Sequence, residues 1–148
     1  MVNIDDSTVI LLAGNRPPPK WSSAESNRYI LDKFKLNHGT GGSPCKIKEL
    51  NRDGLVDLWK GLGYKVGAEV GVDMGVFSNL MFKGIPGLKM YLVDPYAPYK
   101  DNARHVKRSP EAKSIAHKAM KGRNVVWIGE MSETAFNKIK DDHWTLYT

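Results

Sequence analysis

The sequence predicts an α/β fold in which a doubly wound parallel sheet is covered by helices. From residue 51 onward, short apolar runs of strand length alternate with segments whose apolar residues follow a helical period. Such alternation is typical of parallel sheets, whose neighbouring strands are joined by crossover helices. The strands are also continuously apolar, as expected when both faces of a sheet are buried. We predict them at residues 66–70, 90–93, 125–128 and 144–147.

The helices are predicted from their apolar faces and from the residues at their ends. Residues 51–63 place four apolar side chains at i, i+3, i+4 and i+7: Leu55, Leu58, Trp59 and Leu62. The next helix covers residues 76–83. Ser109-Pro110-Glu111 predicts a helix start, because an N-cap residue precedes a proline and a first-turn carboxylate. A last helix covers residues 132–139 and directs three apolar side chains to one side: Ala135, Phe136 and Ile139.

The first third of the chain is less regular. We expect a short strand at residues 8–12 and a helix from Ser22 to about Leu36, since Ser22 and Glu25 have the spacing of a capping box. Residues 38–44 are rich in glycine and read as a linker. We therefore divide the chain into an N-terminal extension and linker, residues 1–48, and a sheet domain, residues 49–148.

Composition limits the classes of protein to be considered. Hydrophobic residues make up 41% and charged residues 26% of 148, an ordinary globular balance. No apolar run is long enough to cross a bilayer, and no signal-peptide pattern precedes the first strand. One cysteine, Cys45, leaves no disulfide framework, and the four histidines lack ligand spacing, so we expect no metal site. These features predict a cytoplasmic protein that does not associate with membranes.

The net charge of +6 is concentrated in one stretch of sequence. Residues 100–123 contain eight basic and two acidic residues, and eight minus two equals the whole excess. A basic stretch of this kind can meet phosphate or an acidic substrate. No aromatic residues interleave with the charges as in a single-strand binding platform. We favour a solvated loop and outer helix face, which makes nucleic acid a possible partner but not the preferred one.

The residues that follow each predicted strand are the candidate binding site. In doubly wound sheets, ligands bind beyond the carboxyl ends of the strands. Gly71 and Gly75 follow the first strand, where they allow a tight turn and a close approach to a helix N-terminus. Glu69 lies inside that apolar strand, where a cationic partner such as an ammonium group would offset its burial. Asp94 follows the second strand and is positioned to accept ribose hydroxyls.

Two segments resemble a known family. Residues 65–78, KVGAEVGVDMGVFS, closely resemble motif I of class I S-adenosylmethionine-dependent methyltransferases, and residues 88–96, LKMYLVDPY, look like their second motif. The pattern is most like that of small bacterial and phage methyltransferases, and the resemblance runs from about Asn51 onward. It implies a Rossmann-like sheet, S-adenosylmethionine as cofactor, and transfer of its methyl group to an acceptor. The acceptor is unidentified, with a small molecule or sugar favoured.

The resemblance implies a role for ten residues. Glu69, Gly71 and Val72 would lie at the methionine portion of the cofactor, with Gly75 and Ser78 supporting that loop and its helix. Asp94 would hold the ribose, and Pro95 and Tyr96 would flank the adenosine. Glu130 and Met131, after the third strand, would border the adenine. No catalytic base is identified among these residues, and the oligomeric state is left open.

The resemblance also departs from the family in two respects. Gly71 and Gly75 stand where the commoner motif has three glycines, and the sequence ends inside the expected fourth strand, without the later strands of the family. We therefore expect the fourth-strand edge of the sheet to leave the domain poorly stable or self-associating, unless the N-terminal third covers it. The chain would supply the cofactor-binding half of a methyltransferase.

Two other functions are open from the sequence. A nicotinamide-dependent oxidoreductase on a Rossmann sheet would carry the motif G-x-G-x-x-G after the first strand, which the segment from Gly71 to Gly75 does not provide. An oxidoreductase of this kind would also not explain why a glutamate, Glu69, lies inside the apolar strand. A non-catalytic cofactor-binding or interaction module is the other alternative, since the segments that would select an acceptor are missing.

Overall fold

The chain folds around one four-stranded mixed sheet. The computed structural model describes residues 9–13, 23–36, 47, 50–97 and 103–139. The strands lie in the order β1-β2-β3-β4. Their bounds are Val9–Ala13 for β1, Val66–Val70 for β2, Lys89–Val93 for β3 and Asn124–Ile128 for β4. Strands β2, β3 and β4 are parallel, as predicted, whereas β1 is antiparallel to β2.

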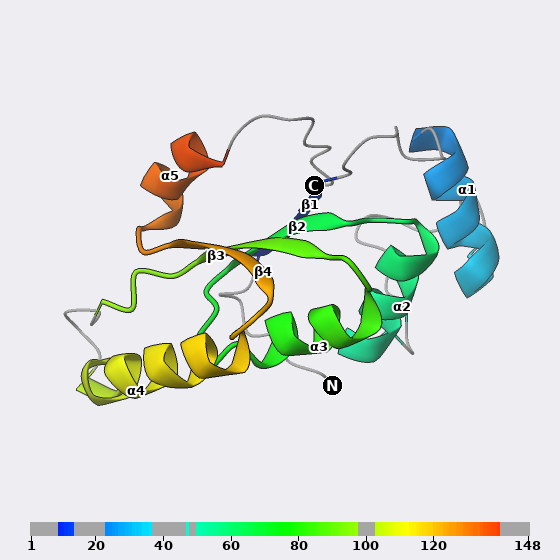
Figure 1. Cartoon of the computed structure of the whole chain (residues 1–148). Helices are drawn as coiled ribbons and strands as arrows, with labels where there is room; N and C mark the ends of the chain where they lie inside the picture. Colours follow the sequence, from blue (N-terminus) through cyan, green and yellow to red (C-terminus); the bar gives the residue numbers. More distant parts are fainter. Residues whose placement is uncertain (1–8, 14–22, 37–46, 48–49, 98–102, 140–148) are drawn as a thin grey trace.

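Helices lie on both sides of this sheet (Figure 1). Helices α2, α3 and α4 lie below it in the view of Figure 1, and α5 lies above the end of β3 and β4. The helices are α1 (Ser23–Phe34), α2 (Arg52–Gly61), α3 (Val76–Gly84), α4 (Ala103–Ala119) and α5 (Ser132–Ala135), the last continued by the 3₁₀ turn η1 (Phe136–Lys138). The α/β class predicted from the sequence is therefore present, with three parallel strands.

The main core lies between the sheet and the helices α2, α3 and α4. Met90 and Leu92 from β3 are fully buried against Met81 of α3 and Ala116 of α4. Two smaller clusters extend it. Leu58 of α2 and its C-cap residue Leu62 pack with side chains of α1, and Ala135 of α5 packs against the ends of β3 and β4 on the opposite face: Val93 and Ile128. Burial on both faces accounts for the apolar run of β2, whereas Val126 of β4 is 37% exposed.

The edge of β2 is covered by the N-terminal strand. All five residues of β1 pair with β2, from Val9 opposite Val70 to Ala13 opposite Val66. This is the edge where the sequence predicted a fourth parallel strand at residues 144–147, which lie outside the described residues. The strand expected at residues 8–12 thus supplies the backbone partner for β2 that would prevent an open edge there. The segment called an extension contributes a strand to the sheet.

Helix α4 begins earlier than predicted. The sequence placed its start at Ser109, but the helix begins at Ala103 and contains Pro110 in its interior. Proline lacks an N–H donor and crowds the preceding turn, at a cost of about 3 kcal/mol. The residues on both sides are strong helix formers, such as Ala103 and Ala112, and the second half is held by the buried Ala112 and Ala116. These local preferences outweigh the proline.

Two further sequence predictions, for Phe136 and for the tryptophans, have different outcomes. Phe136 was expected in the core with Ala135 and Ile139, yet its side chain is 64% exposed because η1 replaces the last helical turn and changes the periodicity. Trp59 and Trp127 pack against the main core as expected. Within the described residues, no helix is long and apolar enough to cross a membrane.

Candidate functional site

The carboxyl ends of the three parallel strands meet at one edge of the sheet, which we call the carboxyl edge. Val70, Val93 and Ile128 are aligned across β2, β3 and β4. The alignment continues one residue further, since the amide of Gly71 donates to the carbonyl of Val93 at 2.9 Å and that of Asp94 to Ile128 at 3.1 Å. The register therefore places the three loops that follow these strands side by side.

The loop after β2 requires glycine at its two ends. Gly71 has φ +80° and Gly75 has φ +73°, in the left-handed region that favours glycine. Gly75 is the N-cap residue of α3, and its amide donates to the carbonyl of Val72 at 2.9 Å. A Cβ on Gly75 would also lie 3.4 Å from the Cβ of Ala116 in α4. These glycines thus shape the turn that brings α3 onto the sheet.

The carboxylate of Asp94 joins the loop after β2 to the loop after β3. Its Oδ2 accepts from the amide of Asp73 at 3.0 Å and its Oδ1 from the amide of Tyr96 at 2.8 Å. The phenol of Tyr96 donates back to the carbonyl of Asp73 at 3.0 Å. An ionised carboxylate has about four acceptor positions, so two backbone donors leave capacity for a ligand.

Both residues bound by Asp94 have unusual backbone conformations. Asp73 has φ +50° and Tyr96 has φ +47°, and a left-handed conformation costs a non-glycine residue roughly 1–2 kcal/mol. Such conformations persist where the surroundings fix them and are concentrated at functional sites. Burial, followed by the charges of Asp94 and Asp73, raises the pKa of the Tyr96 phenol above its ordinary value. Tyr96 therefore remains a hydrogen-bond donor.

Glu69 is buried at the end of β2. Its side chain is 2% exposed, and the hydroxyl of the fully buried Ser78 on α3 donates to its Oε2. Burial raises the pKa of Glu69 to about 7, while the Ser78 bond and the charge of Arg52 partly oppose the rise. The predicted cost of burying this carboxylate is thus met by a hydroxyl donor and by a raised proton affinity. An ammonium partner remains a prediction.

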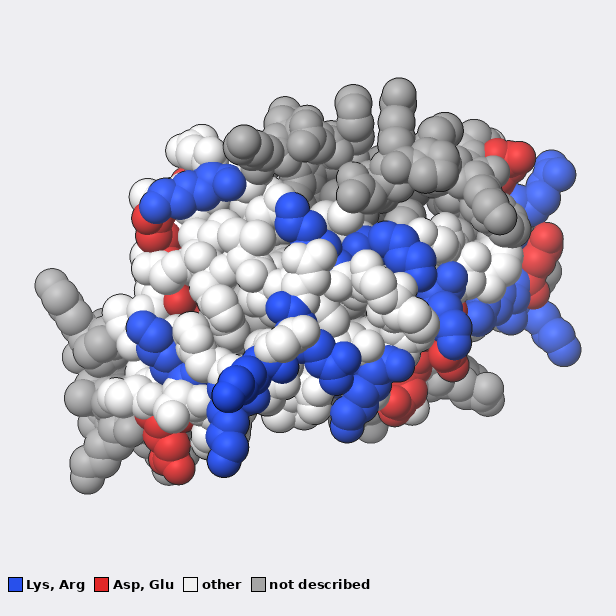
Figure 2. Space-filling view, in the orientation of Figure 1, with Lys and Arg blue, Asp and Glu red and all other residues white. Residues whose placement is uncertain are grey.

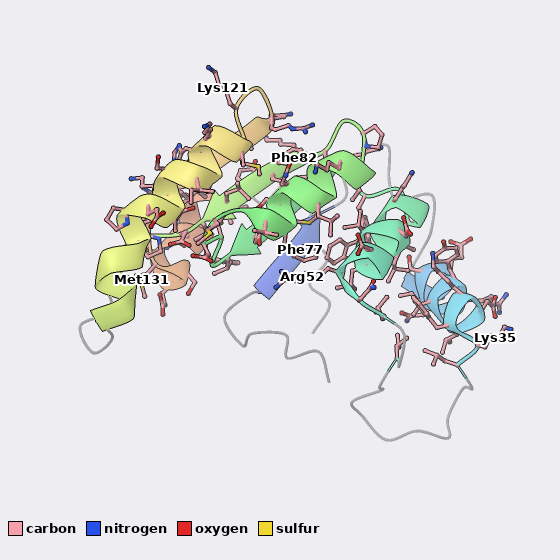
Figure 3. The ribbon with its side chains drawn as sticks, turned by 90° about the horizontal axis from the view of Figure 1, so that it is seen from below. Lys35, Arg52, Phe77, Phe82, Lys121 and Met131 are labelled. Atoms are coloured by element: carbon pink, nitrogen blue, oxygen red, sulfur yellow. The ribbon has the colours of Figure 1, made fainter. Side chains whose placement is uncertain are left out.

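Arg52 is the charged neighbour that sequence reasoning missed. It begins α2, and its guanidinium lies 5.3 Å from the centre of the Phe77 ring on α3 (Figure 3). Figure 3 shows Arg52 and Phe77 together near the middle of the view, and Met131 on the side away from α1. A signal was available in the sequence: α2 precedes β2 through a short connection, so it runs antiparallel to that strand. Its first residue therefore lies toward the carboxyl edge.

The other residues of the predicted site differ in the exposure and contacts of their side chains. The side chain of Val72 is buried in the main core, so a ligand contact from this residue would involve its backbone. Pro95 is half-buried beside Asp94. Met131, 45% exposed, precedes α5, and Glu130 forms an ion pair with Lys138 of η1 that lowers the pKa of its carboxyl. Both follow β4 and lie beyond its end, on the same edge as Asp94.

The carboxyl edge thus brings most of the predicted residues together, and a hydrogen-bonded unit joins the loops after β2 and β3. The two loops are linked by Asp94 and Tyr96, and the strand below them carries the Glu69–Ser78 pair. Glu130 and Met131 lie on the neighbouring loop and share no hydrogen bond with this unit among the described contacts. Within the described part of the chain, no group of His, Cys, Asp and Glu is placed to hold a metal ion. The available chemistry is carboxylate acceptors, backbone donors and a helix N-terminus.

Comparisons with known proteins leave this site to be judged on its own geometry. No protein-family model, curated protein sequence or solved structure matches the chain.

Proposed function

We propose that the carboxyl edge binds S-adenosylmethionine and that the chain takes part in methyl transfer, on a sheet of the class I methyltransferase type. The observation that carries the proposal is the Asp94 carboxylate, which fixes two left-handed residues on adjacent loops. It lies after the second of three parallel strands, where an acidic residue in dinucleotide folds holds ribose hydroxyls. The resemblance of residues 65–78 and 88–96 to methyltransferase motifs points to the same cofactor.

The donor set fits a nucleoside that carries an amino acid. Asp94 has acceptor capacity for ribose hydroxyls, and Glu69 lies one strand away, at the end of β2. The amides of the loop after β2 and the N-terminus of α3 form a positive end suited to the amino acid carboxylate. When bound, S-adenosylmethionine supplies an electrophilic methyl group on its sulfonium.

The residues of this chain would act by orientation. Methyl transfer needs a nucleophile aligned with the methyl carbon and water excluded, an effect of proximity. Asp94 and the glycine-shaped loop would hold the nucleoside, and Glu69 would hold the ammonium group as a carboxylate. The acceptor, a small molecule or sugar in the favoured interpretation, would be selected by residues that we do not identify.

Calorimetric titration tests the cofactor. At pH 8, where Glu69 is mostly ionised, we expect saturable one-to-one binding of S-adenosylmethionine and of S-adenosylhomocysteine. NADH, which shares the adenosine but lacks the amino acid, is expected to bind much more weakly. Asp94→Asn keeps one acceptor oxygen and should weaken S-adenosylmethionine binding at least tenfold, whereas Glu130→Gln should change it little. Tight NADH binding without S-adenosylmethionine binding would overturn the proposal in favour of an oxidoreductase.

A further inference from the structure

The opposite edge of the sheet collects basic side chains from three segments that are distant in the sequence. We call it the amino edge, because β2, β3 and β4 begin there. Each strand is preceded by a short connection from a helix, within residues 60–65, 83–89 and 118–124. These three segments contain no Asp or Glu and seven basic residues: Lys60, Lys65, Lys83, Lys89, Lys118, Lys121 and Arg123.

The strand register brings the backbones of three of these residues into a row, with Lys89 on the opposite face of the sheet from Lys65 and Arg123, because successive residues alternate between faces. Val66, Lys89 and Asn124 are partners across the three strands, and the amide of Lys89 donates to the carbonyl of Lys65 at 2.8 Å. Lys65 and Arg123 each come one residue before their strand. Neighbouring strands are about 4.8 Å apart, so the backbones of the three basic residues span roughly 10 Å. A linear reading of the sequence does not show this row, because its members are more than twenty residues apart.

The charges of the row face neutral partners. The ammonium of Lys65 donates to the carbonyl of Pro86 at 2.7 Å, and that of Lys89 lies 4.9 Å from the centre of the Tyr91 ring. The guanidinium of Arg123 lies 5.6 Å from the centre of the Phe82 ring. These contacts orient the side chains without neutralising them.

The other four basic residues of the amino edge are exposed: Lys60, Lys83, Lys118 and Lys121. Figure 2 shows Lys and Arg side chains gathered on this face over the ends of α3 and α4, with most Asp and Glu toward its margins. In Figure 3, Lys121 points away from the body of the protein, beyond Phe82.

Helix stabilisation explains only part of this cluster. Basic residues in the last turn of a helix interact favourably with its negative end, which accounts for Lys60, Lys83 and Lys118. The effect falls off within that last turn. Lys65, Lys89 and Arg123 stand at the strand starts, beyond the helices, so the macrodipole gives no reason for them. The row is therefore available to an anionic partner outside the chain.

We propose that the amino edge binds the phosphate backbone of a nucleic acid duplex. Duplexes carry closely spaced phosphates that a row of Lys and Arg can neutralise with release of counterions. Single strands are usually held by stacking on exposed aromatic rings, and membrane surfaces by exposed apolar anchors. Among the described residues, the exposed large hydrophobic side chains lie outside the three segments: Val76, Ile115, Val126, Met131 and Phe136. The amino edge thus offers charge without either kind of anchor.

Fluorescence anisotropy with the full chain tests this proposal. The probe is a labelled RNA duplex of about 20 base pairs, titrated at salt concentrations from about 50 to 200 mM, with a DNA duplex of the same sequence as a second probe. We expect binding to both, because the contacts are to phosphate, with affinity falling steeply as salt rises. Neutralising three phosphates contributes a slope of about −2.7 to the plot of log affinity against log salt.

Two variants of equal net charge separate the amino edge from bulk charge. The first is Lys83→Gln/Lys118→Gln/Lys121→Gln, which leaves the contacts of Lys65, Lys89 and Arg123 intact. The control is Arg28→Gln/Lys33→Gln/Lys35→Gln, on the exposed surface of α1 and directly after it. We expect the first variant to weaken duplex binding at least tenfold at low salt and to reduce the salt slope by two to three, while the control changes the slope by less than one.

Three outcomes would overturn the proposal. Equal losses in the two variants, with unchanged circular dichroism, would mean that net charge alone is responsible. Tighter binding to anionic vesicles than to the duplex would assign the amino edge to a membrane surface. Binding of poly-glutamate at least as tight as that of the duplex would assign it to an acidic protein.

Discussion

The two edges of the parallel sheet treat charge in opposite ways. At the carboxyl edge, Glu69 is buried against Ser78, and Asp94 is bound by the amides of Asp73 and Tyr96. At the amino edge, basic side chains are mostly exposed and their contacts are neutral. Under the two proposals, internally bonded carboxylates would make a fixed recognition site, whereas exposed cations would make a surface whose binding responds to salt. The same small sheet would then carry a shaped site at one edge and an electrostatic surface at the other.

The largest effect is expected at Asp94. Asp94→Ala removes the acceptor of two backbone amides that hold Asp73 and Tyr96 in left-handed conformations. Hydrogen bonds to a charged group contribute about 1.5–3 kcal/mol each, so we expect a loss of about 3 kcal/mol in the free energy of unfolding. Urea denaturation measures it. Glu130→Ala, which removes a solvent-screened ion pair, should change stability far less. Equal effects of the two would contradict the proposed role of Asp94.

Glu69 is expected to make stability depend on pH. Its pKa is raised from 4.5 to about 7, so the folded state binds the proton more tightly than the unfolded state. Stability from this group is therefore present at low pH and is lost as pH rises toward about 7, by roughly 3 kcal/mol in all. Glu69→Gln should remove this dependence and be more stable than the unmodified chain at pH 8. Thermal melts from pH 5 to pH 8 measure the difference.

The same group predicts how cofactor affinity depends on pH. A bound ammonium stabilises the carboxylate form of Glu69, so the affinity for S-adenosylmethionine should rise as pH increases through about 7. Ser78→Ala removes the hydroxyl that lowers the pKa and should move this rise to higher pH. A pH-independent affinity would show that Glu69 does not face the ammonium group.

A pair of glycine substitutions compares the two edges directly. Gly75 and Gly122 have φ of +73° and +78°, so alanine at either position is strained by roughly 1–2 kcal/mol. At Gly122, on the amino edge, a Cβ would meet nothing within 4 Å, whereas at Gly75 it would contact Ala116 and Met120. We expect Gly75→Ala to cost more stability than Gly122→Ala and, unlike it, to impair S-adenosylmethionine binding. Calorimetry on both variants provides the measurement, and equal binding would contradict the assignment of the loop.

The smallest effect concerns the start of α2. Asn51 is its N-cap residue, and its side chain accepts from the amide of Gly54 at 2.9 Å. Asn51→Ala should lower the free energy of unfolding by about 1 kcal/mol, measured by urea denaturation. Asn51→Asp is the conservative control and should retain most of the stability. A loss as large as that of Asp94→Ala would mean that α2 carries more of the carboxyl edge than its contacts suggest.

Local patterns predicted the parallel sheet well. Residues 66–70 form β2 with the predicted bounds, and α3 and α5 begin where their sequence signals place them, because burial of one face imposes the observed periodicity. The start of α4 was predicted at Ser109 because Ser109-Pro110-Glu111 is a strong helix-start signal, but the helix continues through Pro110 from Ala103. The pairing of β1 with β2 was also missed, because strand neighbours far apart in sequence leave no local pattern.

The sequence indicated which residues gather at the carboxyl edge but not the hydrogen bonds that they form there. Glu69, Gly71, Gly75 and Asp94 were recognisable from their positions at strand ends, since parallel strands bring those ends together. The bond from Ser78 to Glu69 depends on how α3 packs, and the bonds from Asp73 and Tyr96 to Asp94 depend on positive φ values. Neither set of hydrogen bonds can be predicted from the spacing of residues in the sequence. The row of Lys65, Lys89 and Arg123 likewise needs the strand register.

Chemical-shift mapping by NMR reports on both edges of the sheet in one sample, so a single titration checks that the cofactor and the duplex bind at opposite edges. On addition of S-adenosylmethionine, we predict that the amides of Gly71, Asp73, Gly75 and Tyr96 shift in a saturable manner. The amides of Lys65, Lys89 and Arg123 should stay in place, and should shift only when a duplex is added. Cofactor-induced shifts confined to the amino edge, or none at the carboxyl edge at saturating cofactor, would contradict the account.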